Sequence, residues 1–101
     1  MKEINIPFNK WSKERLRYTK RATTRTKKYG EIGDYFYADG TKFILNLVIK
    51  VPLWFVLQEL WGSEGAVNEF ELHEVWADLH PKKGVDINQM VWYHHFEIEI
   101  K

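Results

Sequence analysis

Lys20, Thr23 and Arg25 place an amine, a hydroxyl and a guanidinium in one short segment of the chain. A lysine amine acts as a base only when its pKa is lowered, and burial or a neighbouring cation such as Arg21 or Arg25 has this effect. A neutral Lys20 could take the proton of the Thr23 hydroxyl, which would attack an acyl carbonyl. Arg25 or a backbone amide could hold the oxyanion. Side chains three residues apart converge in a turn but point to opposite faces of a strand, so the sequence does not decide whether Lys20 and Thr23 meet.

The same segment lies in a strongly basic part of the chain. Residues 10–28 carry nine Lys or Arg side chains and one acid, Glu14, for a net charge of +8, whereas the whole chain is +1 and the rest sums to −7. Such a face favours an anion, usually a phosphate backbone, although a solvated basic helix has the same composition. The predicted cationic contacts are Arg15, Arg17, Arg21, Arg25, Lys27 and Lys28.

Two aromatic residues, Trp11 and Tyr18, alternate with these cations. Aromatic rings beside basic side chains are typical of proteins that stack on unpaired RNA bases. Packing of the same rings onto the core would produce the same pattern. We therefore expect Trp11 and Tyr18 to be base contacts, with packing as the alternative.

The four histidines divide into two groups. His73 and His80 are seven residues apart, on one helix face, but the spacing is not that of an HExxH zinc motif, so we predict no metal and no cofactor. His94 lies on the predicted apolar face of the last strand and is expected in the core. His95 points the other way, with Tyr93, and is predicted to line the rim of a cleft.

The composition predicts one globular domain over residues 1–101. The chain is 45% hydrophobic and has no cysteine, which excludes disulfides and thiolate metal sites. No apolar stretch approaches the ~20 residues that a membrane span needs. The sequence Met1–Ile4 lacks the apolar core of a signal peptide. We therefore expect a soluble, cytoplasmic domain without a membrane partner.

Alternation of apolar and polar residues predicts strands at 34–38, 42–51 and 90–101, the first two joined by a turn at Asp39-Gly40. The strand faces predict one core, with Trp76 and Leu72 packed on it. Its expected members are Phe43, Leu45, Leu47, Ile49, Phe96, Ile98 and Ile100.

Helical spacing predicts a short helix over residues 12–18, a second after Pro52, and a third that starts at Asn68 and stops before Pro81. Gly62 is placed to end the second helix. Strands separated by helices, with high aromatic and β-branched content, indicate an α+β fold in which helices close a small, highly curved sheet or barrel.

Placed on these elements, four motifs resemble those of an ASCH domain, a branch of the PUA-like superfamily. In chain order they are Lys20-x-x-Thr23-x-Arg25, Gly33-Asp34 before a strand, the Glu64-Gly65 turn before a helix, and the closing strand Trp92–Glu97. The resemblance spans about residues 4–100. One difference is Tyr18, which stands where many members have glycine.

The resemblance implies a small PUA-like β-barrel with flanking helices and a cleft associated with RNA or modified-base recognition. Similar small bacterial members hydrolyse N(4)-acetylcytidine, and their catalytic lysine, threonine and glutamate correspond to Lys20, Thr23 and Glu64. Glu64 would orient the lysine or protonate the leaving cytosine amine.

Two functions remain open from the sequence. The first is binding of RNA or a nucleoside in a basic cleft around residues 10–28, with Lys20 an ordinary phosphate contact, Thr23 a turn hydroxyl and Glu64 a helix-terminal acid. The alternative is an amidohydrolase that removes the acyl group from N(4)-acetylcytidine or a related acylated base.

Overall fold

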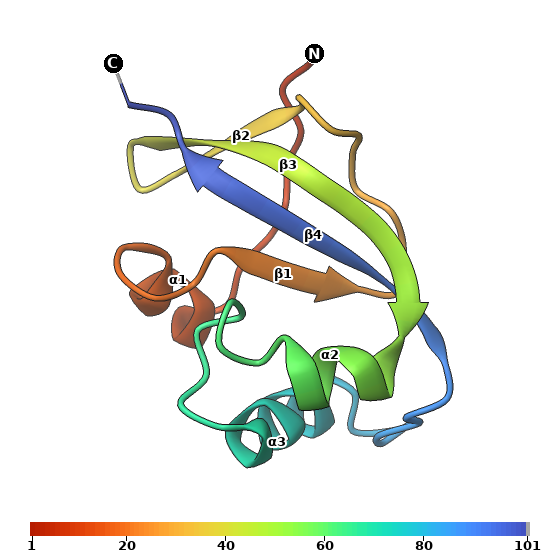
Figure 1. Cartoon of the computed structure of the whole chain (residues 1–101). Helices are drawn as coiled ribbons and strands as arrows, with labels where there is room; N and C mark the ends of the chain where they lie inside the picture. The colour runs from red at the N-terminus through yellow and green to blue at the C-terminus, as the bar shows by residue number, and fades with distance from the viewer. Residues whose placement is uncertain (101) are drawn as a thin grey trace.

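The computed structural model describes residues 1–100, which form one curled antiparallel sheet and three helices (Figure 1). The sheet has the strand order β1-β4-β3-β2 and closes about half of a barrel. This confirms the predicted α+β class. The elements are α1 (Lys10–Leu16), β1 (Ala22–Arg25), β2 (Tyr35–Ala38), β3 (Thr41–Pro52), α2 (Leu53–Glu59), α3 (Glu69–Leu79) and β4 (Met90–Ile98).

The helices begin where their capping residues lie. The Asn68 side chain accepts a hydrogen bond from the Glu71 backbone N–H at 2.9 Å, so α3 starts as predicted. Asn9 caps α1 in the same way through the Ser12 N–H at 2.8 Å, which starts this helix two residues before the predicted position. Helix α2 follows Pro52 as expected but ends at Glu59, before Gly62.

The turn between β2 and β3 is the predicted hairpin. Asp39 and Gly40 have φ angles of 55° and 79°, as in a type I′ turn, and Ala38 pairs with Thr41 across it. The N-terminal segment adds a short parallel bridge between Glu3 and Tyr35 at this edge.

The prediction of a single core on one strand face is wrong, because β3 contains an irregularity. Leu45 pairs with Phe96, but Leu47 pairs with His95, so Asn46 is an extra residue in β3. A bulge of this kind exchanges the two faces of the strand. Leu45 is consequently buried, while Leu47 is 39% exposed.

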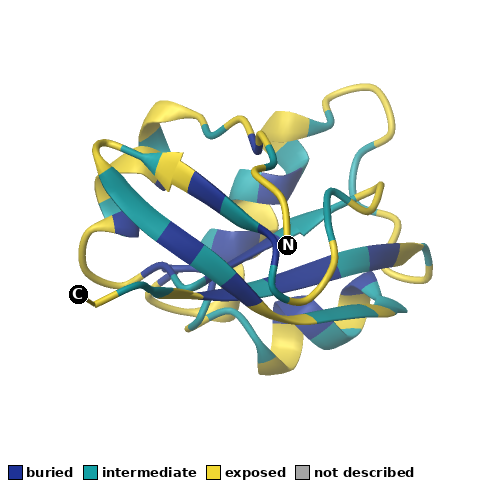
Figure 2. Ribbon diagram, turned by 90° about the horizontal axis from the view of Figure 1, so that it is seen from above, coloured by how far each residue is buried: buried dark blue, intermediate teal, exposed yellow. Residues whose placement is uncertain are grey.

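Two hydrophobic clusters result, one on each face of the sheet. Phe43, Leu45 and Phe96 belong to the first, together with Ile6, Leu16 and Phe36. Trp76 and Leu72 belong to the second, against which Ile49 also packs; its other buried members are Ala22, Leu53, Val56, Leu57, Ala66, Val91 and Tyr93. Figure 2 shows buried positions along the inner strands and exposed ones in the loops. Ile100, predicted in the core, is 90% exposed.

We expect the bulge to separate the effects of two similar substitutions on stability. Leu45→Ala should lower the free energy of unfolding by about 2–5 kcal/mol, because it opens a cavity in the first cluster. Leu47→Ala should lower it by less than about 1 kcal/mol. Urea unfolding measures both values, and equal losses would contradict the assigned register.

Candidate functional site

A buried ion pair joins two distant segments. Lys20 follows α1, and its Nζ donates to Oε1 and to the backbone oxygen of Glu64, each at 3.1 Å, although the residues are 44 apart in sequence. Both residues are buried, with 2% and 4% of their surface exposed. Two of the three residues predicted to be catalytic therefore meet directly.

Gly65 allows this approach. Its φ is 93°, which L side chains rarely adopt, and a Cβ there would lie 3.1 Å from Lys20 Cβ and 3.2 Å from Arg15 Cβ. The Glu64-Gly65 pair singled out in the sequence thus has a physical role. The glycine lets the turn before α3 press against the loop after α1.

Burial changes the chemistry of the lysine. Loss of hydration lowers the pKa of Lys20 from its usual 10.5, and the attraction and hydrogen bond of Glu64 only partly oppose this effect. Arg25 and Arg15 lower the Lys20 pKa further by repulsion. An amine with a lowered pKa is a candidate for proton transfer.

The two adjacent threonines have different partners. Thr24 Oγ1 donates to Glu64 Oε2 at 2.5 Å, so Glu64 links this hydroxyl to the Lys20 amine. Thr23 is buried, and its Oγ1 accepts from Arg25 Nε at 3.0 Å. The sequence interpretation selected Thr23, whereas the structure places Thr24 on the carboxylate.

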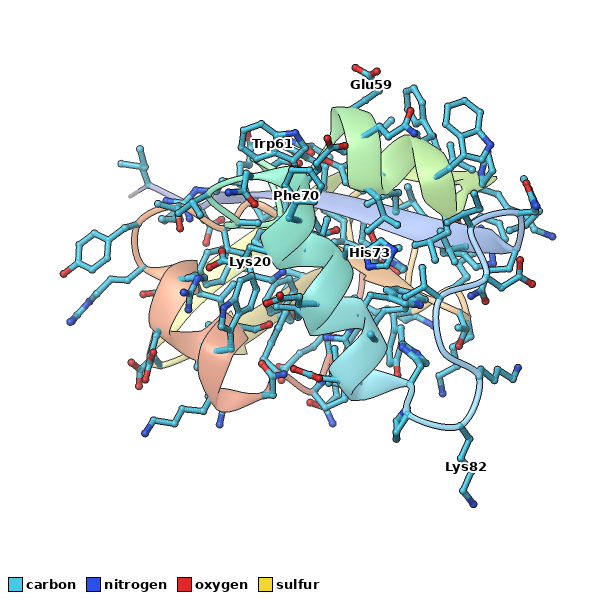
Figure 3. The ribbon with its side chains drawn as sticks, turned by 90° about the horizontal axis from the view of Figure 1, so that it is seen from below. Lys20, Glu59, Trp61, Phe70, His73 and Lys82 are labelled. Carbon is cyan, nitrogen blue, oxygen red and sulfur yellow. The ribbon has the colours of Figure 1, made fainter. Side chains whose placement is uncertain are left out.

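These residues line a cavity of about 310 Å³ between α1, β1 and α3. In Figure 3, Lys20 lies between α1 and α3 when the molecule is viewed from below. One wall is polar and carries Thr23, Thr24, Arg25, Lys27, Tyr29 and Glu64, with Trp11 beside it. The opposite wall is apolar and comes from α2 and α3, through Leu53, Val56, Leu57, Leu72, Val75, Trp76 and Leu79.

His94 holds the polar wall in place from the face of the sheet that carries the first hydrophobic cluster. Its Nε2 accepts from the Tyr29 N–H at 3.0 Å, so its Nδ1 carries the proton and donates to the Thr23 oxygen at 3.2 Å. His94 is buried, as predicted, and desolvation lowers its pKa from 6.5. This neutral imidazole ties β1 to the segment that carries Tyr29.

Arg25 is held at the wall of the cavity. Its Nη2 donates to the Pro7 oxygen at 2.6 Å, and its guanidinium lies 5.5 Å from the Tyr29 ring centroid. Lys27, which is exposed, lies 4.8 Å from the same ring.

Several residues predicted to bind a ligand also have partners within the protein. Arg21 donates to the oxygens of Leu16 and Lys20 at 2.8 and 2.7 Å, which satisfies the end of α1. Arg15 lies 4.0 Å from the Trp11 ring, and Lys28 pairs with Glu31. These contacts leave Trp11 as an aromatic wall of the cavity.

Three other predicted contacts lie outside this cavity. Arg17 and Tyr18 are exposed beyond the end of α1, and Tyr18 does not take the positive φ that a glycine there would permit. His95 bonds to Asn46 through Nδ1 at 2.8 Å and lines a separate hollow near Ser63. His95 thus borders a different hollow from the one that contains Lys20 and Glu64.

Thr24 and Tyr29 are the site residues that the sequence interpretation missed. Thr24 lies inside the motif Lys20-x-x-Thr23-x-Arg25 and Tyr29 follows it by four residues. Which threonine faces Glu64 depends on where β1 begins. Leu72 and Trp76 of the apolar wall were predicted as core, because apolar residues at helical spacing usually pack inward.

The fold is that of an ASCH domain. No protein-family model matches the sequence, and the search of curated proteins found no match. Among solved structures, the ASCH domain from Lactobacillus crispatus JV V101 superposes with a TM-score of 0.73 at 14% identity, over 96% of this chain and 78% of that one. A protein from Enterococcus faecalis V583, described as DUF984, superposes with a TM-score of 0.60 at 15% identity, over 90% of this chain and 68% of that one. The resemblance in the motifs is thus confirmed at the level of the fold.

Over residues 1–100, no helix is long and apolar enough to cross a bilayer. In the same range, no cluster of three His, Cys, Asp or Glu side chains is placed to hold a metal ion.

We expect the stability of the protein to fall below pH 6.5 through His94. Because the native pKa of His94 lies below its usual 6.5, the unfolded chain binds more protons between these two values, and stability decreases as the pH falls through that window. Urea unfolding at several pH values should show that the free energy of unfolding depends less on pH in His94→Gln than in the wild type. The exposed His73 gives the control His73→Gln, and an unchanged slope in His94→Gln would refute this role.

Proposed function

We propose that the cavity binds a nucleoside or an unpaired base of RNA. The observation that carries this proposal is the pairing of a polar, cationic wall with an apolar wall around about 310 Å³. Ligand pockets usually measure about 300–1,000 Å³ and combine apolar lining with a few placed polar groups. A base has the matching faces, because its ring is apolar above and below and its edges form hydrogen bonds.

The surroundings of the cavity favour a ligand with a phosphate or ribose attached. Lys27 is exposed at the cavity, and Trp11 and Tyr29 offer aromatic rings there. Stacking on such rings and contact with cations are typical of single-stranded RNA recognition. Lys20 has a different role, since an amine that is 2% exposed and paired with Glu64 is not an ordinary phosphate contact.

A second candidate function is hydrolysis of an amide on the bound base. The observation that favours it is the buried chain of contacts from Lys20 through Glu64 to Thr24, in which a carboxylate joins an amine of lowered pKa to a hydroxyl. The resemblance to ASCH domains implies N(4)-acetylcytidine as the substrate. With water it would give acetate and cytidine.

Incubation of the wild-type protein with N(4)-acetylcytidine, followed by absorbance, tests this second candidate. Formation of cytidine above the uncatalysed rate supports hydrolysis. Absence of conversion at stoichiometric protein concentration would contradict it and leave the binding proposal standing.

For the binding proposal, we expect affinity for a short single-stranded RNA to fall as salt rises, because bound phosphates release counterions. Lys27→Ala should weaken binding and reduce the slope of log affinity against log salt by about 1. Lys82→Ala is the matched control, because this exposed lysine projects into solvent from the loop after α3 (Figure 3). Fluorescence anisotropy measures both slopes. Binding that is independent of salt, or equally weakened by both variants, would contradict the proposal.

A further inference from the structure

The pairing of β1 with β4 separates Thr23 from Thr24. Thr24 pairs with Tyr93 and Thr23 with His94, and partners in an antiparallel pair project to the same side of the sheet. Tyr93 belongs to the cluster that contains the α2 and α3 side chains. Thr24 therefore faces the side of the sheet that these helices cover. The Thr23 side chain leaves β1 from the opposite face, although Thr23 also borders the cavity.

The hydrogen bonds agree with this separation. Thr24 Oγ1 donates to Glu64 Oε2 at 2.5 Å, while Oε1 of the same carboxylate accepts from Lys20 Nζ at 3.1 Å. Thr23 Oγ1 instead accepts from Arg25 Nε. The side chain of Arg25 is itself fixed to the Pro7 oxygen.

Access to a ligand also differs between the two threonines. Thr24 is partly exposed at the cavity, whereas Thr23 is only 4% exposed. A nucleophile must approach the carbonyl carbon to within about 3–3.5 Å before it reacts. Thr24 is a partly exposed residue with its hydroxyl beside a carboxylate, and Thr23 is a buried residue with its hydroxyl beside a cation.

We infer that Thr24, rather than Thr23, is the nucleophile of the hydrolysis proposed above, and the inference rests on that second candidate function. Glu64 acts as its general base, and Lys20 orients the carboxylate and supplies a positive charge beside the reacting carbonyl. Thr23 is a positioning residue, which acts by holding Arg25.

The reaction balances with water as the only co-reactant. Thr24 Oγ bonds to the amide carbonyl carbon, and its proton passes to Glu64. The C–N bond then breaks, the amine nitrogen takes that proton, and the acyl group remains as an ester on Thr24. A water molecule adds to the ester and gives a proton to Glu64. The C–O bond to Thr24 breaks, the carboxylic acid leaves and Thr24 regains its proton.

Matched substitutions test the assignment with N(4)-acetylcytidine as the probe. Thr24→Val should lower turnover at least about 100-fold, because it removes the nucleophile and keeps the side-chain shape. Thr24→Ser should retain measurable turnover, and this rescue excludes a merely structural loss. Thr23→Val should lower turnover less than Thr24→Val does. Thr41, which pairs with Ala38 in the β2–β3 hairpin and does not line the cavity, provides the remote control Thr41→Val. Thermal unfolding of each variant checks that it is folded.

A covalent readout identifies the reacting atom directly. Acid quenching during turnover, followed by proteolysis and fragment mass spectrometry, should find the acetyl ester on Thr24. An ester on Thr23, or a larger loss in Thr23→Val than in Thr24→Val, would overturn this inference and leave hydrolysis intact. A wild-type protein without turnover would instead refute the hydrolysis itself, and the assignment of Thr24 with it.

Discussion

The buried ion pair between Lys20 and Glu64 is the interaction on which the candidate site depends. Removing two charges from water is costly. Attraction between the charges offsets this cost only when the geometry is good and the charged atoms are hydrogen-bonded, as the Lys20 amine and both Glu64 carboxylate oxygens are here. Loss of one partner from such a pair typically destabilises a protein by about 3–5 kcal/mol, because the other charge stays buried. A hydrophobic pair would fill the same space without that liability. A buried ion pair of this kind, placed at a cavity, is therefore a candidate functional site rather than strong evidence of stability.

The pair also fixes the position of the edge strand. The loop after α1 and the turn before α3 are joined by the pair, by the close approach at Gly65, and by the Arg21 N–H bonded to the Ser63 oxygen at 2.6 Å. β1 leaves this junction and pairs only with β4. Its Thr24 side chain consequently reaches Glu64, while His94 holds the Thr23 oxygen behind it. Binding and any chemistry would thus take place at a junction of segments distant in sequence.

Local patterns predicted most of the fold, and tertiary contacts account for what they missed. Asn68, Pro52 and Asp39-Gly40 carry their own backbone preferences, so the elements that they start or turn were predictable. The extra residue Asn46 does not interrupt the alternation of apolar and polar residues in the sequence. It nevertheless exchanges the faces of β3 and divides the core in two. The convergence of Lys20 with Glu64 followed from the family resemblance. The choice between Thr23 and Thr24 depended on the phase of a four-residue strand, which the sequence does not determine.

The proposed site contains a buried Lys20 amine, and nuclear magnetic resonance of the protein with isotope-labelled lysines observes that amine directly. The Lys20 signals, assigned by their absence in Lys20→Met, should titrate at lower pH than those of the exposed lysines, because desolvation lowers the pKa of Lys20. They should also shift when N(4)-acetylcytidine is added. Titration of Lys20 together with the other lysines, and signals unchanged by the nucleoside, would contradict the proposed site.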